Sequence, residues 1–358
     1  MSVSMTPKQK KVLDFITRYI SEKRYSPTQE EIAKKLKLSV STVNTYIKIL
    51  VEKGYVQQGA GARNLSLTQS SNVTNSVRRF DIGIIGYGIV GQAVHYGFSR
   101  SNVHIYDKYK NTDTLEDVVA SSEYIFVGLP TPTMADESGI DLSIVDEMVA
   151  KIAKIAAGTD KIVIIKSTVT PGTTEKYIKK YPKVLFCFNP EFLRESSSLS
   201  DFVNTDRIVV GASSDDTFRR VSSLYQSITP MVPIYYTDPT TAEMVKYMAN
   251  CYLATKVIFA NEMYDICEKI GVKYGEVKKM VVADKRIKDT HLDITTTRGF
   301  GGKCFPKDLL SLRAMAKSKG VNTAILDAVW KKNLAIRKTR DWEEIPFAVS
   351  KPGFGKKS

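Results

Sequence analysis

Apolar residues near the start of the chain recur at the spacing of helix faces. Residues 8–23 carry one such face, and shorter amphipathic helices are predicted over residues 29–36 and from about residue 40 to residue 53. Residues 55–67 alternate around a glycine-rich centre, as a β-hairpin does. Three helices followed by a hairpin predict a winged helix-turn-helix domain over residues 1–69.

The following stretch changes from a linker to alternating strands and helices. Residues 70–78 are polar and lack periodicity, which is typical of a flexible linker. Between residues 79 and 235, short apolar runs alternate with helical segments, and they predict an α/β domain, a Rossmann-type doubly wound parallel sheet. Its strands are predicted at residues 80–85, 103–106, 124–129, 161–166, 184–189 and 207–211.

Beyond residue 235 the apolar pattern becomes helical. Residues 240–270 contain neither proline nor glycine, and their spacing predicts one helix of about thirty residues. Shorter helices are expected at 309–316 and 324–337. We therefore expect an all-helical domain over residues 236–340, followed by a poorly ordered tail, 341–358.

Composition limits the class of protein. The chain has 358 residues with ordinary apolar and charged fractions, and it contains no signal peptide and no apolar run near the length of a membrane span. Its four cysteines, at 187, 251, 267 and 304, lack metal-ligand spacing, and only three histidines are present. We expect a soluble cytoplasmic protein with reduced thiols, no metal site and no membrane partner.

Positive charge is concentrated in the predicted winged helix-turn-helix domain. Residues 1–69 hold twelve Lys and Arg against five Asp and Glu, so an acidic polymer such as double-stranded DNA is a plausible partner. Exposed short polar side chains on the third helix suit base edges, and basic side chains suit phosphates. The candidate DNA contacts are Ser41, Thr42, Asn44, Thr45, Lys48 and Arg63.

The segment Ser26–Ala33 resembles the N-terminal DNA-binding domain of the LexA repressor family. The resemblance ends with residue 69, because the repressor's Ser-Lys protease domain is not recognisable downstream. A winged helix can also bind protein or serve a purely structural role, and these alternatives stay open.

A glycine-rich turn follows the first strand of the predicted sheet. Gly86-Tyr87-Gly88-Ile89-Val90-Gly91 precedes a helix, and Asp107 ends the next strand twenty-one residues after Gly86. Such glycines let the backbone approach a pyrophosphate, and an acid at this distance accepts hydrogen bonds from ribose hydroxyls. Asp107 favours NAD over NADP, whereas the adjacent Lys108 weakens that preference. The alternative is a tight turn without a ligand. The candidate cofactor contacts here are Gly86, Gly88, Ile89, Val90, Gly91, Asp107 and Lys108.

The stretch Gly299–Asp308 places one thiol, Cys304, among glycines, two lysines and an aspartate. Neighbouring cations favour the thiolate, which is the nucleophilic form. If Pro306 opens a helix, Asp308 faces back toward the sulfur. The alternative is a glycine turn carrying a buried, inert cysteine.

This stretch resembles the active-site cysteine loop of the UDP-glucose/GDP-mannose 6-dehydrogenase family. Segments at 130–133, 166–174, 189–195 and 242–250 are similar to further signatures of that family, and the resemblance covers about residues 79–340. It implies oxidation of the C6 hydroxyl of a nucleotide sugar to a carboxylate, with NAD as cofactor and a thioester on the enzyme. The usual member continues with a second Rossmann-like domain, so we expect weaker substrate affinity here.

The resemblance also implies residue roles. Cys304 is the nucleophile, Lys246 and Asn250 hold an oxyanion, and Thr168 with Glu195 positions the hydrolytic water. Asp308 orients that water, Glu191 has a supporting role and Thr131 contacts NAD, as do Thr168 and Glu195. The implied substrate contacts are Phe192, Leu193, Lys246, Asn250, Arg286, Phe300, Gly301 and Lys307. Arg286 would act across a homodimer interface formed by the helix 240–270.

Several readings remain open from the residues alone. Glu191 and Glu195 suit a helix N-terminus, and Lys246 and Asn250 suit an ordinary helix surface. UDP-glucose, GDP-mannose and an N-acetylated sugar are all candidate substrates, with UDP-glucose favoured. A one-step NAD-dependent dehydrogenase is one rival. The other is a DNA-binding transcriptional regulator that senses NAD or a nucleotide sugar.

Overall fold

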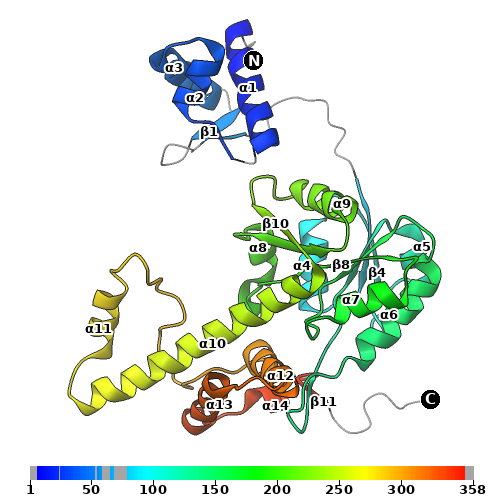
Figure 1. Cartoon of the computed structure of the whole chain (residues 1–358), viewed down its shortest axis with the longest axis vertical. Helices are drawn as coiled ribbons and strands as arrows, with labels where there is room; N and C mark the ends of the chain where they lie inside the picture. The colour runs from blue at the N-terminus through cyan, green and yellow to red at the C-terminus, as the bar shows by residue number, and fades with distance from the viewer. Residues whose placement is uncertain (1–5, 24, 53–54, 59–64, 68–78, 351–358) are drawn as a thin grey trace. The chain divides into compact units, whose positions relative to one another are not determined.

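A computed structural model describes residues 6–23, 25–52, 55–58, 65–67 and 79–350 (Figure 1). The chain divides into two compact units, residues 1–78 and residues 79–358. The division falls at the end of the predicted linker. The linker residues 70–78, the predicted DNA contact Arg63 and the last part of the tail lie outside the described residues.

The first unit contains the three predicted helices and the predicted hairpin. Thr28 caps the second helix, because its hydroxyl accepts from the Glu31 backbone N–H while Glu31 accepts from the Thr28 N–H. The core lies between the helices, with Val43, Ile47 and Leu50 of the third helix fully buried. The elements are α1 (Pro7–Lys23), α2 (Gln29–Leu36), α3 (Val40–Glu52), β1 (Val56–Gln58) and β2 (Leu65–Leu67), with β1 and β2 antiparallel.

A seven-stranded sheet organises the second unit, and its order is β10-β9-β8-β7-β5-β3-β4. Buried side chains alternate between the two faces: Ile125 and Val127 belong to one core cluster, whereas Tyr124 and Phe126 belong to the other. The strands are β3 (Asp81–Ile85), β4 (Asn102–Tyr106), β5 (Tyr124–Val127), β7 (Ile162–Ile165), β8 (Leu185–Phe188), β9 (Ile208–Ala212) and β10 (Ile234–Thr237).

The predicted Rossmann-type sheet is confirmed with one correction. β9 is antiparallel to β8 and parallel to β10, so the last two strands run against the other five. Apolar alternation reports which face a side chain takes, but it does not report strand direction, which depends on the connecting segment. The strand β10 was not predicted, because its side chains are mostly exposed at the sheet edge.

Helices cover both faces of the sheet, as a doubly wound fold requires. One face packs on α5, α6 and α7, and the other packs on α4, α8 and α9. These helices are α4 (Ile89–Gly97), α5 (Leu115–Ser121), α6 (Ser143–Ala156), α7 (Thr173–Lys180), α8 (Ser198–Val203) and α9 (Asp215–Gln226), with a short 3-10 turn η1 (Glu195–Ser197) before α8.

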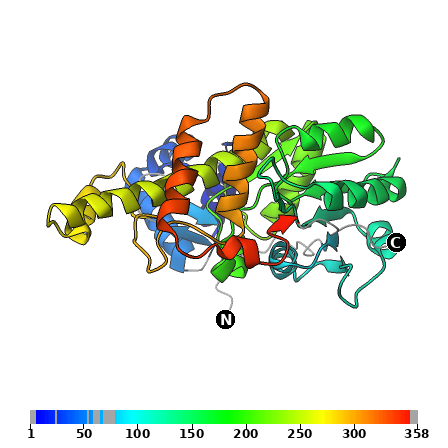
Figure 2. The same ribbon diagram turned by 90° about the horizontal axis from the view of Figure 1, so that it is seen from below.

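The long helix α10 (Pro239–Lys269) leaves the sheet and carries the helical part of the second unit. Its 31 residues match the predicted length, and Asp238 caps its first turn through the Thr241 backbone N–H. Figure 2 shows α12 (Cys304–Ser318) and α13 (Ala324–Ile336) crossing α10, against which they pack, and α11 (Tyr274–Val281) follows the far end of α10. Among the described helices, α10 included, none is long and apolar enough to span a membrane.

The expectation of a poorly ordered tail after residue 340 is wrong for residues 341–350. They form α14 (Asp341–Glu344) and β11 (Val349–Ser350), and β11 pairs in parallel with β6 (Thr133–Met134). Trp342 is buried against Trp330 of α13, with 5.5 Å between ring centroids. An aromatic pair and a strand partner hold this segment, and the sequence pattern did not reveal either partner.

Candidate active site

The first βα turn forms a cradle of backbone atoms. Gly86 has φ +92°, and a Cβ on Gly91 would lie 2.2 Å from the Gly86 carbonyl oxygen, so both positions require glycine. Gly88 is the N-cap of α4, and a Cβ placed there would meet no atom within 4 Å. The helix N-terminus therefore faces open space with its N–H groups available to an anion.

Asp107 lies beside this cradle at the end of β4. Its two carboxylate oxygens accept the backbone N–H groups of Tyr87 and Tyr109 at 2.8 and 2.9 Å. A carboxylate has about four lone-pair positions, so the ribose hydroxyls of a dinucleotide can still donate to it. The exposed Lys108 points its ammonium toward the ring of Tyr109, 5.8 Å away. The turn and the acid fit NAD.

The loops after β5 and β7 are joined by one serine. The Ser167 hydroxyl donates to the Leu129 carbonyl oxygen at 2.9 Å and accepts from the Leu129 N–H at 2.7 Å. This pairing holds the loop of Thr131, which is buried, beside the loop of Thr168, which is half-buried. The two threonines predicted to contact cofactor and water therefore share one edge of the sheet.

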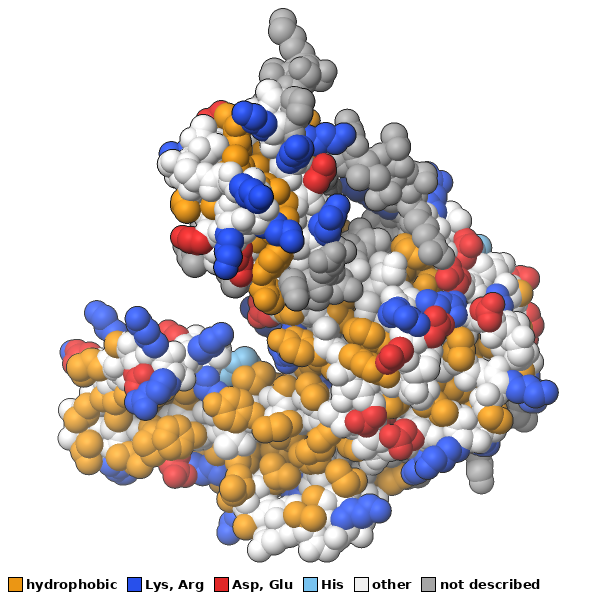
Figure 3. All heavy atoms as spheres, turned by 45° about the horizontal axis from the view of Figure 1, so that its top comes forward, with side chains coloured by type: hydrophobic (Ala, Val, Ile, Leu, Met, Phe, Trp, Pro, Cys, Tyr) orange, Lys and Arg blue, Asp and Glu red, His pale blue; other side chains and the backbone are white. Residues whose placement is uncertain are grey.

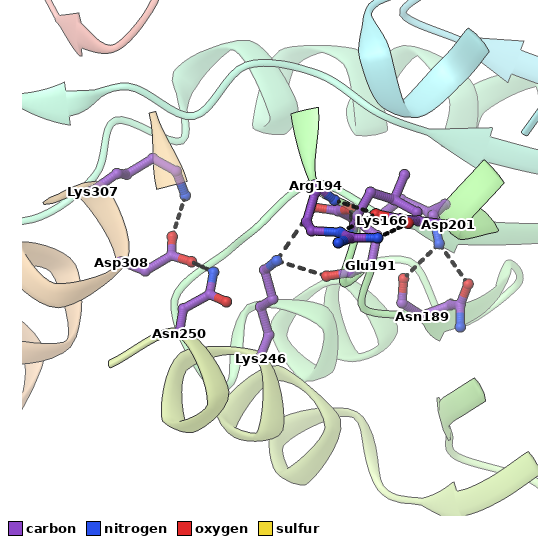
Figure 4. A network of polar contacts seen from close by, with 10 residues as sticks. Lys166, Asn189, Glu191, Arg194, Asp201, Lys246, Asn250, Lys307 and Asp308 are labelled. Carbon is purple, nitrogen blue, oxygen red and sulfur yellow. Dashed lines mark hydrogen bonds and ion pairs between the residues drawn. The ribbon is translucent and has the colours of Figure 1, made fainter. Parts of the chain in front are cut away.

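A buried ion pair connects this edge to α10. The Lys246 ammonium donates to the Glu191 backbone oxygen at 2.6 Å and to its carboxylate at 3.3 Å (Figure 4). Burial by itself lowers the pKa of Lys246, but the charges of Glu191 and Asp308 outweigh it, and the pKa is raised. Lys246 therefore stays a cation inside the protein, and Glu191 is closer to the centre of the site than its supporting role implied.

One turn further along α10, Asn250 bonds to Asp308 of α12. The Asn250 amide donates to one carboxylate oxygen at 2.6 Å, and the Lys307 ammonium donates to the other at 2.6 Å. Asp308 is 1% exposed, so these partners replace water around its charge. Lys307, which the resemblance implied as a substrate contact, is paired with Asp308 in the structure.

The thiol of Cys304 lies at the first residue of α12. Pro306 is within the first turn, so the helix begins earlier than predicted and Asp308 lies on the same face one turn on. Burial raises the pKa of the Cys304 thiol. The nearby cations Lys246 and Lys307 lower this pKa, whereas the acids Asp308 and Glu191 raise it. The thiol remains accessible to solvent, in contrast to the three buried cysteines. The two lysines favour the thiolate as expected, but burial and the two acids outweigh them, so the pKa of the thiol is raised overall.

The loops after β5 and β7 and the cluster on α10 and α12 lie in two parts of the second unit that match two domains of one known family. Residues 101–229 match the NAD binding domain of the UDP-glucose/GDP-mannose dehydrogenase family, and residues 240–335 match its central domain. Residues 101–335 belong to this family.

Known members of the UDP-glucose/GDP-mannose dehydrogenase family align over most of the second unit. The UDP-glucose 6-dehydrogenase of Rickettsia bellii is 36% identical over 233 residues, which are 64% of this chain and 53% of that protein. UDP-glucose 6-dehydrogenase TuaD of Bacillus subtilis is 34% identical, over 62% of this chain and 48% of that protein. The chain thus spans about half the length of the curated relatives it matches.

The fold agrees with solved dehydrogenases. The UDP-glucose dehydrogenase of the archaeon Pyrobaculum islandicum superposes with a TM-score of 0.67 at 29% identity, covering 74% of this chain and 70% of that one. The family resemblance read from the sequence is confirmed, and NAD is the cofactor named for the matched domain.

The remaining predicted cofactor and substrate contacts of the second unit differ in how far they are buried. Phe192 lies between cations, with the Arg207 guanidinium 4.1 Å and the Lys246 ammonium 5.6 Å from its ring centroid. Leu193 is half-buried against a core cluster, and Glu195 is exposed on η1. Of the cofactor contacts, Ile89 is exposed and Val90 half-buried in the first turn of α4.

Two predicted substrate contacts have other partners in the structure. Phe300 is 4% exposed, and its ring packs against Trp330 in the helical core. Arg286 is bound to Asp284, two residues earlier, and its side chain is 87% exposed. Gly301 lies against Arg337 in the loop before Cys304.

The sequence reasoning missed two buried charged groups of the second unit. Glu243 of α10 is fully buried and accepts the backbone N–H groups of Gly172 and Thr174, at 2.5 and 2.8 Å. It therefore caps α7 from a different helix. Glu243 is three residues before Lys246 and so lies on the same face of α10. That spacing was the feature of the sequence that could have identified Glu243.

The second missed group is Lys166, at the end of β7. Its ammonium donates to the Asn189 side-chain oxygen at 2.8 Å, and the Tyr225 hydroxyl donates to the same oxygen. Burial lowers the pKa of Lys166 to about 8. Its position directly after four apolar strand residues was the only sequence sign of its burial.

The first unit also matches a known family, because residues 2–63 match the LexA DNA binding domain. On α3, Ser41, Thr45 and Lys48 are exposed, and Thr42 and Asn44 are half-buried. The Ser39 hydroxyl caps the helix by accepting the Thr42 N–H at 3.1 Å. The predicted recognition face is therefore free of the core that Val43, Ile47 and Leu50 form.

Proposed function

We propose that the chain is an NAD-dependent nucleotide-sugar 6-dehydrogenase that oxidises the C6 hydroxyl to a carboxylate through a thioester on Cys304. The observation that carries the proposal is the grouping of an accessible thiol with the buried Lys246, Asn250 and Asp308. UDP-glucose is the proposed substrate, because the curated relatives quoted above are UDP-glucose 6-dehydrogenases.

The first half of the reaction forms the covalent intermediate. The turn of Gly86 and Gly91 with Asp107 would hold NAD, and two NAD molecules bound in turn would each supply the acceptor for one hydride from C6.

In the first oxidation the C6 hydroxyl also loses its proton, to water. Cys304 then gives its proton to water and its sulfur adds to the C6 aldehyde, so that a C–S bond forms and the carbonyl double bond becomes an oxyanion. Lys246 is a buried cation and Asn250 retains one N–H, so both can stabilise that oxyanion. The second oxidation leaves the acyl group on sulfur as a thioester.

The second half releases the product. A water held by Thr168, Asp308 and Glu195 attacks the acyl carbon, so that a C–O bond forms and the C–S bond breaks. A carboxylate accepts the proton of the water, and the thiolate leaves. Glu191 holds Lys246 through the whole cycle by the ion pair described above.

We also propose that two copies associate through α10. Met244, Met248, Tyr252 and Phe259 are 38–68% exposed and recur at helical spacing along it. They lie about 200° around the helix from Lys246 and Asn250, since consecutive residues are about 100° apart. Figure 3 shows apolar side chains gathered over this helical part. Met248→Glu should turn a dimer into a monomer in light scattering, whereas an unchanged mass would contradict this assignment.

The activity is tested by incubating the full chain with NAD and either UDP-glucose, GDP-mannose or a UDP-N-acetylhexosamine. We expect NADH with UDP-glucose, and we expect Cys304→Ser to stop before the carboxylate. The absence of NADH with all three sugars would contradict the proposal. A Cys304→Ser variant that still forms the carboxylate would contradict the thioester.

A second candidate function rests on the match to the LexA DNA binding domain. In this alternative the chain is a DNA-binding regulator, and the second unit senses NAD or a nucleotide sugar. Selection from a random duplex library with and without UDP-glucose tests it. A consensus sequence whose affinity changes with the sugar, together with no NADH formation, would favour the regulator over the enzyme.

A further inference from the structure

The glycine turn before Cys304 is hydrogen-bonded by residues of α13 and α14, which follow it in the chain. Asn333 of α13 is fully buried and brackets Phe300, accepting its backbone N–H at 2.8 Å and donating to its carbonyl oxygen at 3.1 Å. A Cβ on Gly299 would lie 2.4 Å from the Asn333 side-chain oxygen. Glycine is therefore required here because a neighbouring helix presses on the turn.

Asp341 holds the next part of the turn. One carboxylate oxygen accepts the Gly302 N–H at 2.9 Å, and the other accepts two N–H groups of Arg337 at 2.8 and 3.0 Å. Arg337 in turn donates to the Arg298 carbonyl oxygen at 2.8 Å. A Cβ on Gly301 would lie 2.3 Å from Asp341, so the contact is close on both sides. The turn is thus fixed two residues before the thiol.

The same segment reaches the cofactor side of the unit. After α14 the chain forms β11, and the Ala348 carbonyl oxygen accepts the N–H of Thr133, two residues after Thr131. The Ser350 hydroxyl donates to Asp141 at 3.0 Å. Residues 337–350 therefore contact both the loop of the thiol and the loop of the predicted NAD contact.

We propose that Asp341 is a positioning residue for Cys304. The proposal rests on the proposed function for the role of the thiol, but its structural part stands on the Gly302 contact. The family match ends at residue 335, so Asp341 lies outside the part of the chain aligned to the central domain. Asp341 fixes Gly302, the turn sets the first residue of α12, and β11 ties this support to the cofactor loop.

The test compares Asp341→Ala, Asp341→Asn and Glu343→Gln in the full chain. Glu343 is a matched control, since it is an exposed acid of α14 whose partner Arg340 is also exposed. Hydrogen exchange of peptides covering residues 299–305 reports the turn without any substrate. We expect Asp341→Ala to speed exchange of this turn about tenfold, because a hydrogen bond to a charged group is lost. Asp341→Asn keeps an oxygen for Gly302 and should stay within about threefold of wild type.

Kinetics then separate positioning from general damage. For Asp341→Ala we expect kcat to fall about tenfold while KM for the sugar and the affinity for NAD stay unchanged. Asp341→Asn should recover most of kcat. Unchanged exchange in Asp341→Ala, or equal losses in both Asp341 variants, would overturn the positioning role. If wild type forms no NADH, the proposed function fails, and the exchange result still decides whether Asp341 fixes the turn.

Discussion

The amide of Asn250 donates to the buried carboxylate of Asp308, with 2.6 Å between Nδ2 and Oδ2. This bond joins α10 to α12, one helical turn after Cys304. Lys307 on the other oxygen completes the partners of Asp308. One N–H of Asn250 fixes the carboxylate, and in the proposed mechanism the other N–H binds the oxyanion.

Replacing charges beside Cys304 should shift its reactivity in opposite directions. Lys246 lowers the pKa of the Cys304 thiol and Asp308 raises it. Lys246→Met should raise the apparent pKa of alkylation by iodoacetamide, and Asp308→Asn should lower it. Lys246→Met should also lower kcat by about a hundredfold, since it removes an oxyanion donor.

The pH profile of Cys304 alkylation, read by peptide mass, checks this prediction. The buried Cys187, Cys251 and Cys267 serve as internal controls for unfolding. Shifts of the same sign in the two variants would show that the charges do not act on the thiol as the structure indicates.

Glu243 should stabilise the second unit because it accepts two backbone N–H groups at the start of α7. Glu243→Ala leaves the N–H groups of Gly172 and Thr174 without their acceptors, and a buried unmet donor costs about 1–3 kcal/mol. We expect the thermal midpoint to fall by about 5–10 °C. Glu147→Ala is the control, because its side chain is 66% exposed and pairs only with Lys151 at the surface. It should change the midpoint by less than about 2 °C. Similar midpoints for the two variants would contradict the capping role.

The free energy of unfolding should depend on pH through the titration of Lys166. Its pKa in the folded protein is lowered to about 8, so between that pH and its ordinary pKa the unfolded chain binds more protons. The buried charge of Lys166 destabilises the folded protein, and this destabilisation is fully present well below pH 8. It diminishes as the pH rises above 8, so the free energy of unfolding increases. Relative to Lys166→Met, wild type should gain about 1 kcal/mol in free energy of unfolding between pH 7 and 9. Parallel curves from urea unfolding would contradict the assignment.

DNA binding by the first unit should depend on Lys48. If this exposed lysine of α3 meets a phosphate, Lys48→Ala should weaken binding to a random 20-base-pair duplex and reduce the slope of log affinity against log salt by about 0.9. Lys319→Ala, which removes an exposed lysine of the second unit, should leave the slope unchanged. Fluorescence anisotropy of the full chain at several salt concentrations measures both. Equal slopes for wild type and Lys48→Ala would exclude this contact.

Local patterns predicted those features that depend on near neighbours. The core strands were predicted because side chains such as Ile164 and Phe188 are buried in continuous apolar runs. The direction of β9 and the pairing of β11 with β6 depend on distant segments, which periodicity does not report. The resemblance implied Phe300 as a substrate contact, whereas in the structure its ring packs against Trp330 in the core.

The residues that meet at the site were predicted better than the contacts that hold them. Lys246, Asn250, Cys304 and Asp308 were identified from their motifs, and the structure brings them together. The partners that hold them, such as Glu243, come from separate elements. Their importance depends on burial, which a polar residue in a sequence does not reveal.

The most direct test of the central claim is the number of NADH molecules formed per UDP-glucose consumed, for wild type and for Cys304→Ser. The account predicts two NADH for each sugar oxidised to the carboxylate by wild type, and no carboxylate from the variant. One NADH per sugar, with full activity in Cys304→Ser, would contradict four-electron oxidation through a thioester on this cysteine.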